Sequence, residues 1–251
     1  MPHPTDPPIA RQTDDLTALA DAFECVDTWV FDLDNTLYPP ISNLFDQVDE
    51  RMGAFIAELL SVDRVEARRV QKDYYIRHGT TLSGLIREHG IEPERFLDYV
   101  HDIDVSHLVA DRELAAAIGA LPGRRIIFTN GSRAHAENVT RQLEIEHLFE
   151  DVFDISAAEY VPKPNEEAYR RFLDRHLVVP ERAAMFEDIA RNLEIPHTLG
   201  MRTVWVKPGE PGEEAHERLA HEGAEGDHVQ YTTENLAGFL DLLLKALPAQ
   251  R

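Results

Sequence analysis

Short apolar runs rich in β-branched and aromatic residues recur along the chain, and patterns of helical spacing lie between them. The helical patterns include residues 133–144 and 165–176. This alternation predicts βαβ units, and therefore an α/β fold with a parallel sheet covered by helices on both faces. The predicted strands cover residues 28–31, 125–128, 152–155, 183–186 and 203–206.

The two ends of the chain carry weaker patterns. Residues 1–15 are rich in proline and polar side chains, which predicts a loose tail, and residues 16–25 predict a short amphipathic helix. Residues 209–227 are rich in Glu and Gly, which predicts a solvated loop or a frayed helix. A last edge strand over 228–231 and a terminal helix over 234–246 complete the expected fold.

Residues 40–110 interrupt the alternation, because they contain helical patterns and no convincing strand. Apolar residues recur at helical spacing over residues 44–60, and the pattern continues over 64–77, 82–89 and 94–101. We interpret this stretch as an inserted, all-helical cap domain. The predicted division is a tail and short helix over 1–24, a core over 25–39 and 111–251, and a cap over 40–110.

Polar residues follow three of the predicted strands at the points where the strands end. Parallel sheets bind their ligands outside the carboxyl ends of the strands. We therefore expect these residues to share one site. They are Asp32 and Asp34, Thr129 and Asn130, and Glu187 and Asp188.

Asp32 and Asp34 are two residues apart and suit a nucleophile with an acid/base partner. Asp32 would attack phosphorus and form an aspartyl-phosphate, which divides one difficult displacement into two easier ones. Asp34 would protonate the leaving oxygen and later deprotonate the attacking water. A calcium loop would need Gly at Leu37 and Glu at Asn43 within a helix-loop-helix setting, and these are missing. A plain acidic turn remains open for these residues alone.

Two further segments suit phosphate binding. The hydroxyl and N–H groups of Thr129, Asn130 and Gly131 precede a helical pattern, where they can hold a phosphate oxygen. The alternative is that Ser132 only caps the helix and the preceding residues make a turn. Lys163 lies between two prolines that stiffen its backbone, and its ammonium suits a phosphoryl group. The alternative there is a solvated surface lysine.

Glu187 and Asp188 are paired acids that point in different directions, so we expect one to bind a metal directly and the other to act through a neighbour. Asp188 is our choice for the direct ligand. Hard oxygen ligands favour Mg²⁺, which bridges to a substrate phosphate. An acidic helix N-terminus is the alternative.

The formal net charge of −21 argues against nucleic-acid and anionic-membrane partners. It also requires that a phosphate site contain local cations, from a metal ion and from Lys or Arg. No apolar signal segment follows a basic start and no run reaches the length of a membrane span, so we expect a cytoplasmic protein. The single cysteine, Cys25, excludes an internal disulfide framework.

In order along the chain, FDLDNTLY, FTNGS, the lysine of VPKP and FEDIARN resemble the four motifs of the haloacid dehalogenase superfamily, in its phosphatase branch. The resemblance spans about residues 26–206 and implies a Rossmann-like core with an inserted helical cap that selects the substrate. The implied roles are nucleophile for Asp32, acid and base for Asp34, phosphate holder for Thr129 and Lys163, and Mg²⁺ ligand for Asp32, the Asp34 backbone carbonyl and Asp188.

Within that branch, FDLDNTLYPP, the cap segment YIRHGTTLSGL and the closing motif look most like pyrimidine 5′-nucleotidases. Those enzymes release phosphate from UMP or CMP. The resemblance therefore implies a nucleoside monophosphate as substrate, with its base or ribose against the cap. The side chains that would contact it are Tyr75, Arg77, His78 and Thr81.

Other functions remain open on the sequence. They are a phosphatase for phosphoglycolate or a sugar phosphate, a phosphosugar mutase similar to β-phosphoglucomutase, and a non-catalytic interaction protein on this scaffold. Carbon–halogen cleavage is disfavoured, because it needs neither Mg²⁺ nor an acid at Asp34. Both a monomer and a homodimer are compatible with the sequence.

Overall fold

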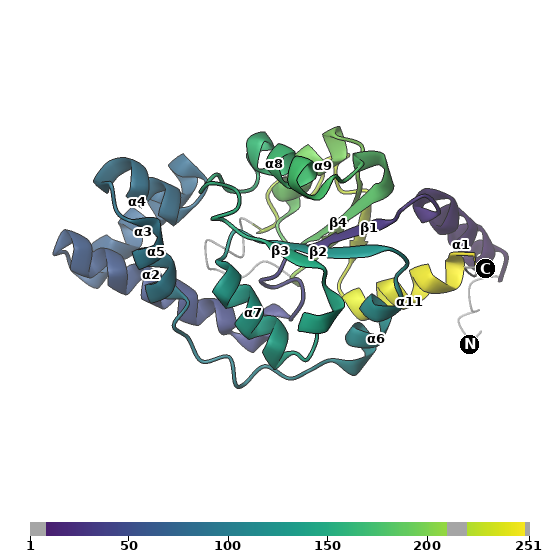
Figure 1. Cartoon of the computed structure of the whole chain (residues 1–251), viewed down its shortest axis with the longest axis horizontal. Coiled ribbons are helices and arrows are strands. Elements are labelled where there is room, and N and C mark those ends of the chain that lie inside the picture. Colours follow the sequence, from purple (N-terminus) through teal and green to yellow (C-terminus); the bar gives the residue numbers. More distant parts are fainter. Residues whose placement is uncertain (1–8, 210–219, 249–251) are drawn as a thin grey trace, which may run out of the picture.

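A six-stranded parallel sheet forms the centre of the molecule, as the sequence predicts (Figure 1). The computed structural model describes residues 9–209 and 220–248. The strand order is β3-β2-β1-β4-β5-β6. The strands are β1 (Thr28–Phe31), β2 (Arg124–Phe128), β3 (Asp151–Phe153), β4 (Ala183–Glu187), β5 (Arg202–Val206) and β6 (Tyr231–Thr233).

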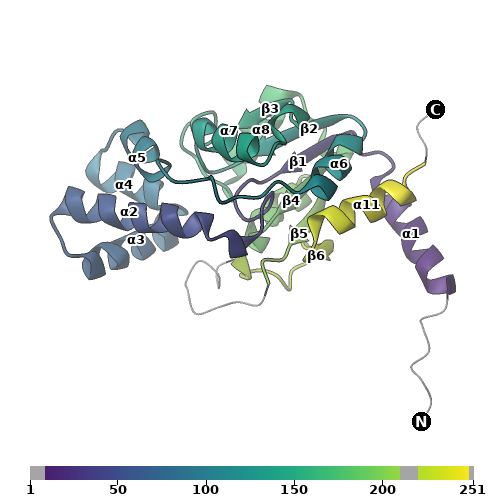
Figure 2. The same ribbon diagram turned by 90° about the horizontal axis from the view of Figure 1, so that it is seen from below.

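Helices cover both faces of this sheet (Figures 1 and 2). On one face lie α1 (Ile9–Phe23), α6 (Arg112–Ala120), α7 (Arg133–Gln142) and α11 (Leu236–Ala246); on the other lie α8 (Glu166–His176) and α9 (Glu194–Thr198). Side chains alternate between the two faces along β1, so that Phe31 stacks on Phe186 on one side while Val30 packs with Phe128 and Met185 on the other. The result is a core with two buried layers, as helix-covered parallel sheets require.

Several predicted boundaries are wrong. The helix expected over 16–25 begins at Ile9, so it includes part of the expected tail. The third strand ends at Phe153, because Asp154 turns away and its carboxylate accepts hydrogen bonds from the backbone N–H groups of Arg133 and Ala157. The last strand lies at Tyr231–Thr233 rather than 228–231. Of the segment predicted as a solvated loop, residues 210–219 lie outside the described part of the chain.

Four helices between β1 and α6 form a bundle beside the sheet (Figure 1). They pack around their own cluster of buried side chains, which includes Val48, Phe55, Tyr74, Leu85 and Phe96. We call α2 to α5 the helical insertion. Its members are α2 (Leu44–Leu60), α3 (Arg64–His78), α4 (Thr81–His89) and α5 (Pro93–Val100).

Local sequence signals explain where these helices begin. Asp63 caps α3 by accepting a hydrogen bond from the Glu66 N–H, and Thr80 caps α4 through the Ser83 N–H. Gly84 allows α3 and α4 to approach, because a Cβ there would lie 2.4 Å from the Cβ of Tyr74. Over the described residues, no helix is long and apolar enough to span a membrane.

Candidate active site

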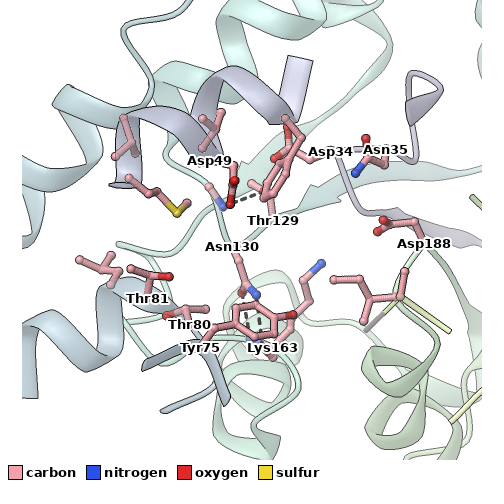
Figure 3. Close-up of a pocket in the computed structure, with 18 of the residues that line it drawn as sticks. Asp34, Asn35, Asp49, Tyr75, Thr80, Thr81, Thr129, Asn130, Lys163 and Asp188 are labelled. Atoms are coloured by element: carbon pink, nitrogen blue, oxygen red, sulfur yellow. Dashed lines mark hydrogen bonds between the residues drawn. The ribbon is translucent and has the colours of Figure 1, made fainter. Parts of the chain in front are cut away.

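The carboxyl ends of β1, β2 and β4 face a cavity of about 330 Å³ that the helical insertion closes from the other side (Figure 3). Asp34, Thr129, Lys163 and Asp188 line the sheet side of this cavity, and Tyr75 lines the side of the insertion. The cavity therefore joins the polar strand ends to the helices inserted after β1.

Asp32 continues β1 by one residue, because its N–H still donates to the carbonyl of Phe186 in β4. Its buried carboxylate accepts a hydrogen bond from the Lys163 ammonium at 2.7 Å. Burial, together with the charge of Glu187, raises the pKa of Asp32 to about 7 even though Lys163 opposes the change. The Lys163 ammonium therefore supplies the charge that favours the ionised form of Asp32.

Lys163 is 2% exposed and makes three hydrogen bonds. Besides Asp32, its ammonium donates to Glu187 at 2.7 Å and to the carbonyl of Phe128 at 2.8 Å. Burial alone would lower the pKa of Lys163, but the carboxylates of Asp32 and Glu187 outweigh it and hold that pKa above its usual value. Lys163 is not a solvated surface lysine.

Asn130 holds the backbone of Lys163. Its amide donates to the Lys163 carbonyl at 3.2 Å and accepts from the Lys163 N–H at 2.8 Å. Both hydrogen-bonding groups of the Asn130 side chain are engaged in this way, although the residue also lines the cavity. Its contacts position the lysine.

Asp32, Glu187 and Asp188 form the one group of potential metal ligands found among the described residues. One carboxylate oxygen from each lies within 4.8 Å of the others, and all three side chains are buried. Burial and the charges of its two neighbours raise the pKa of Asp188 well above its usual value. Because Lys163 is the single ammonium bonded to this group, the cluster fits a hard divalent cation.

Glu187 and Asp188 differ in their contacts. The Glu187 carboxylate accepts from Lys163 at 2.7 Å and from the Asn192 amide at 3.1 Å. The carboxylate of Asp188 interacts with that of Glu187 and lines the cavity beside Ile189. This difference suits the expected division between a residue that acts through a neighbour and a direct ligand.

Asp34 does not bond to Lys163 but to a second set of side chains. Its Oδ1 accepts hydrogen bonds from the Tyr38 hydroxyl at 2.5 Å and from Nε2 of His135 at 2.7 Å. Burial would raise the pKa of Asp34, but the interactions with His135 and Tyr38 outweigh it and lower that pKa to about 2. Asp34 is therefore ionised in the free protein.

The segment after β2 forms a tight turn at the start of α7. The N–H of Gly131 donates to the Thr129 hydroxyl at 2.9 Å, and a Cβ on Gly131 would lie only 3.2 Å from that hydroxyl. Ser132 caps α7 by accepting from the His135 N–H. The alternative interpretation of Ser132 as a helix cap is correct, whereas Thr129 and Gly131 line the cavity.

Residues 75–85, the segment that resembles pyrimidine 5′-nucleotidases, supply fewer cavity residues than expected. Thr81 lines the cavity, and its hydroxyl donates to the Gln71 carbonyl at 3.4 Å. Arg77 is outside the described lining and pairs with Asp73 at 2.5 Å. His78 is outside it too and packs against Tyr74. The cavity lining therefore includes neither Arg77, which lies on another face of α3, nor His78, and their contact with a substrate stays a prediction.

The face of α3 toward the cavity carries a different set. Gln71 donates to Asp49 on α2 at 2.7 Å, and Arg68 pairs with the other oxygen of Asp49. Tyr75 packs under the Arg191 guanidinium, whose carbon lies 5.1 Å from the ring centre. Apolar side chains complete this wall, among them Phe45, Met52 and Phe96.

The family model that describes haloacid dehalogenase-like hydrolases matches residues 26–196. The chain belongs to this family. The matched residues include Asp32, Asp34, Thr129, Lys163 and Asp188, and so all of the cluster around Lys163 belongs to the shared part of the haloacid dehalogenase-like (HAD) hydrolase.

Other proteins resemble this HAD hydrolase more distantly. Phosphate metabolism protein 8 of Saccharomyces cerevisiae is 28% identical over 134 residues, which are 49% of this chain and 41% of that protein. The chain therefore matches less than half of this relative.

Solved structures share the fold at low identity. A HAD phosphatase from Thermococcus onnurineus has a TM-score of 0.57 at 16% identity, over 87% of this chain and 98% of that chain. The magnesium-bound HAD hydrolase YfnB of Bacillus subtilis has a TM-score of 0.53 at 15% identity, over 87% and 98%. A dehalogenase with an intermediate complex has a TM-score of 0.56 at 18% identity, over 88% and 98%. These likenesses support the HAD fold over most of the chain.

Three groups at the site of this HAD hydrolase escape sequence reasoning. They are Tyr38 and His135 on Asp34, and the Asp49, Arg68 and Gln71 set on the cavity wall. Arg68, Gln71 and Tyr75 recur at the helical spacing of one face, so that signal was available in the sequence. His135 offers no such signal, because it lies 101 positions from Asp34.

Proposed function

We propose that this protein is a Mg²⁺-dependent phosphomonoester hydrolase that works through a phosphorylated Asp32. The observation that carries the proposal is the meeting of three buried carboxylates, those of Asp32, Glu187 and Asp188, with the buried ammonium of Lys163. Asp32, Asp188 and the backbone carbonyl of Asp34 would hold the ion. When bound, Mg²⁺ supplies positive charge that offsets the charge of the phosphate and of the carboxylates.

In the first step, a carboxylate oxygen of Asp32 forms a bond to phosphorus as the bond from phosphorus to the ester oxygen breaks. Lys163 and Thr129 hold the phosphoryl oxygens and so keep phosphorus in line with the nucleophile. Lys163 is held rigidly for this task by its contacts with Glu187 and Asn130. Water then attacks the aspartyl-phosphate, which releases inorganic phosphate and restores the Asp32 carboxylate.

Asp34 moves the protons in both steps. It gives a proton to the leaving oxygen in the first step and takes one from the attacking water in the second. Its pKa of about 2 in the free protein keeps it ionised, as the second step requires. A phosphate dianion that binds beside Asp34 raises this pKa through charge repulsion, which favours the protonated form needed first.

We propose further that residues 40–110 act as a cap on a core formed by 25–39 and 111–251. The helical insertion has its own buried cluster, and its side chains form one wall of the cavity. The YfnB structure is described as revealing interdomain movement, which supports a cap that opens and closes. Such movement would admit the substrate and exclude water during phosphoryl transfer.

The substrate that we propose is a pyrimidine nucleoside monophosphate, UMP or CMP. A cavity of about 330 Å³ is large enough for a small organic ligand. Phe45, Met52 and Phe96 offer apolar surface to a flat base, and the bonded groups of Asp49 and Gln71 offer polar atoms to its edge. The resemblance of the cap segment to pyrimidine 5′-nucleotidases supports the same choice.

A phosphate-release screen over nucleotides, sugar phosphates and phosphoglycolate, with and without Mg²⁺, tests this function. We expect Mg²⁺-dependent release with preference for UMP and CMP, and loss of at least about 10³-fold in kcat for Asp32→Asn. Asp174→Asn, on an exposed part of α8, is the control. Substantial turnover by Asp32→Asn would contradict the nucleophile, and preference for phosphoglycolate would contradict the substrate.

Product analysis separates the alternatives on this fold. An isomeric sugar phosphate instead of free phosphate would identify a mutase. Halide leaves carbon without a proton, so a dehalogenase has no use for the buried contacts that hold Asp34. Absence of turnover on every substrate would favour a non-catalytic interaction protein.

A further inference from the structure

A pair of histidines connects Asp34 to the helical insertion. His135 in α7 is 1% exposed, and its Nε2 donates to Oδ1 of Asp34 at 2.7 Å. His101, which ends α5, stacks on the His135 ring with centroids 4.4 Å apart and planes 12° apart. Nδ1 of His101 also lies 2.9 Å from the Ser132 hydroxyl. The stack therefore joins a residue of the insertion to the first turn of α7.

The orientation of His135 depends on packing. Its Nδ1 is buried without a hydrogen-bond partner in the described part of the chain, so the bond to Asp34 is the only polar restraint on the ring. One hydrogen bond permits the ring to swing about its acceptor. The ring of His101 covers one face of His135 and restricts that movement.

The orientation of Asp34 depends on His135 in turn. Tyr38 and His135 both donate to Oδ1 of Asp34. Oδ2 lies toward Gly131, at 3.6 Å from the position of a Cβ on that residue, and Asp34 lines the cavity. The two donors thus fix Oδ1 in place. Oδ2 remains available to the ester oxygen of a substrate bound in the cavity.

We propose that His135 is a positioning residue for Asp34, and that His101 completes this positioning only when the helical insertion is seated on the core. The inference rests on the proposed phosphatase activity and adds its regulation. When the helical insertion closes over the leaving group of a substrate, it therefore also fixes the orientation of the Asp34 carboxyl that protonates that group. Proton transfer is disfavoured while the insertion is open, because His135 has lost the ring that holds it.

Two esters of similar shape test the role of His135. 4-Nitrophenolate leaves readily without a proton, whereas phenolate departs more easily when protonated, and kcat/KM reports the step in which the leaving group departs. For His135→Leu we expect kcat/KM to fall about 10²-fold with phenyl phosphate and less than about 10-fold with 4-nitrophenyl phosphate. His135→Gln keeps a donor near the Nε2 position and should recover much of the difference.

His176→Leu provides the matched control, because His176 is a second buried histidine that packs on Phe153 and Phe172 away from Asp34. We expect it to leave the ratio of the two kcat/KM values unchanged. Equal losses on both esters in His135→Leu, or no recovery in His135→Gln, would overturn the positioning role. A wild-type protein that releases phosphate from neither ester would instead overturn the proposed function.

The role of His101 is tested in the same way. His101→Ala removes the stack and should reproduce the selective loss with phenyl phosphate, whereas His101→Phe keeps the stack and should retain the wild-type ratio. Tyr99→Leu is the control for packing within the insertion, because Tyr99 contacts Phe55 and Arg51 there. A rise in KM alone for His101→Ala, with the ratio unchanged, would show that His101 only shapes the cavity.

Discussion

Charge balance around Lys163 governs the site at the scale of single residues. Asp32 and Glu187 both pair with the ammonium of Lys163. Because the three groups are buried, their attraction is strong, and loss of the ammonium would cost much folding free energy. Removal of the ammonium would leave two buried carboxylates without a positively charged partner. Lys163 therefore stabilises the folded site, in addition to its proposed role in binding phosphate.

Replacement of Lys163 by Met should lower the free energy of unfolding by about 3–5 kcal/mol in the absence of divalent cations. Part of that loss should return with Mg²⁺, which can offset the same carboxylates. Urea unfolding with and without Mg²⁺ measures both effects. Wild-type stability in the metal-free variant would mean that the carboxylates are not charged in the folded protein.

Asp188→Asn should have the opposite effect. The pKa of Asp188 is raised by burial and by Glu187 and Asp32, so a neutral amide relieves repulsion and should stabilise the metal-free protein. In wild type, Mg²⁺ at 100 times its dissociation constant should add about 2.7 kcal/mol to the free energy of unfolding. Asp188→Asn should lose most of that gain, while the exposed Asp174→Asn keeps it. An equal Mg²⁺ effect in both variants would place the ion elsewhere.

Much of the site could be predicted from the polar residues that directly follow the strands. Asp32, Thr129 and Asp188 each follow a strand, and the parallel sheet brings strand ends to one edge whatever their distance in sequence. Tyr38 and His135 were not predictable in this way. Their relation to Asp34 depends on the path of the loop after β1 and on the rotation of α7, which single-sequence patterns do not specify.

Helix rotation decides which side chains reach the cavity at the scale of elements. In α3, Arg68, Gln71 and Tyr75 share the face toward the cavity, and Arg77 lies on another face. Resemblance identifies a segment but not its face, which explains why Arg77 was expected beside the cavity. The period of the helix contains the missing information once one cavity residue is known.

The contact between α3 and α4 gives a prediction at this scale. Gly84→Ala would place a Cβ 2.4 Å from the Cβ of Tyr74, so the two helices must separate. We expect a loss of about 1–3 kcal/mol in the free energy of unfolding. Gly119→Ala in α6, whose new Cβ would meet Leu148 at an ordinary 3.4 Å, is the matched control and should be tolerated. Thermal unfolding of the two variants compares them, and equal stability would contradict the close approach.

Contact between the helical insertion and the core is the main feature at the scale of the whole molecule. The alternation of strands and helices, and its interruption by several helices after the first strand, were predictable because each follows from hydrophobic spacing. The stacking of His101 on His135 was not, since it joins two separately packed parts of the chain. Under the proposed function, a net charge of −21 makes this contact more important, because a closed site would bring the phosphate against Lys163 and away from the acidic surface.

This contact should make stability depend on pH. Burial and the facing His135 lower the pKa of His101 from 6.5 to about 3, although Asp34 opposes the change. Between these values the unfolded chain binds a proton at His101 that the folded protein does not bind, so folded stability falls as the pH drops below 6.5.

His101→Phe should remove this contribution of His101 to the pH dependence of stability. Relative to the variant, the wild type should lose up to about 1.4 kcal/mol per pH unit between about pH 6 and 4. Urea unfolding of both proteins across this pH range measures the difference between their free energies of unfolding. The titration of carboxylates that both proteins contain cancels in this difference. Parallel curves would mean that His101 is free to take up a proton in the folded protein, and that the insertion is not seated on His135 in solution.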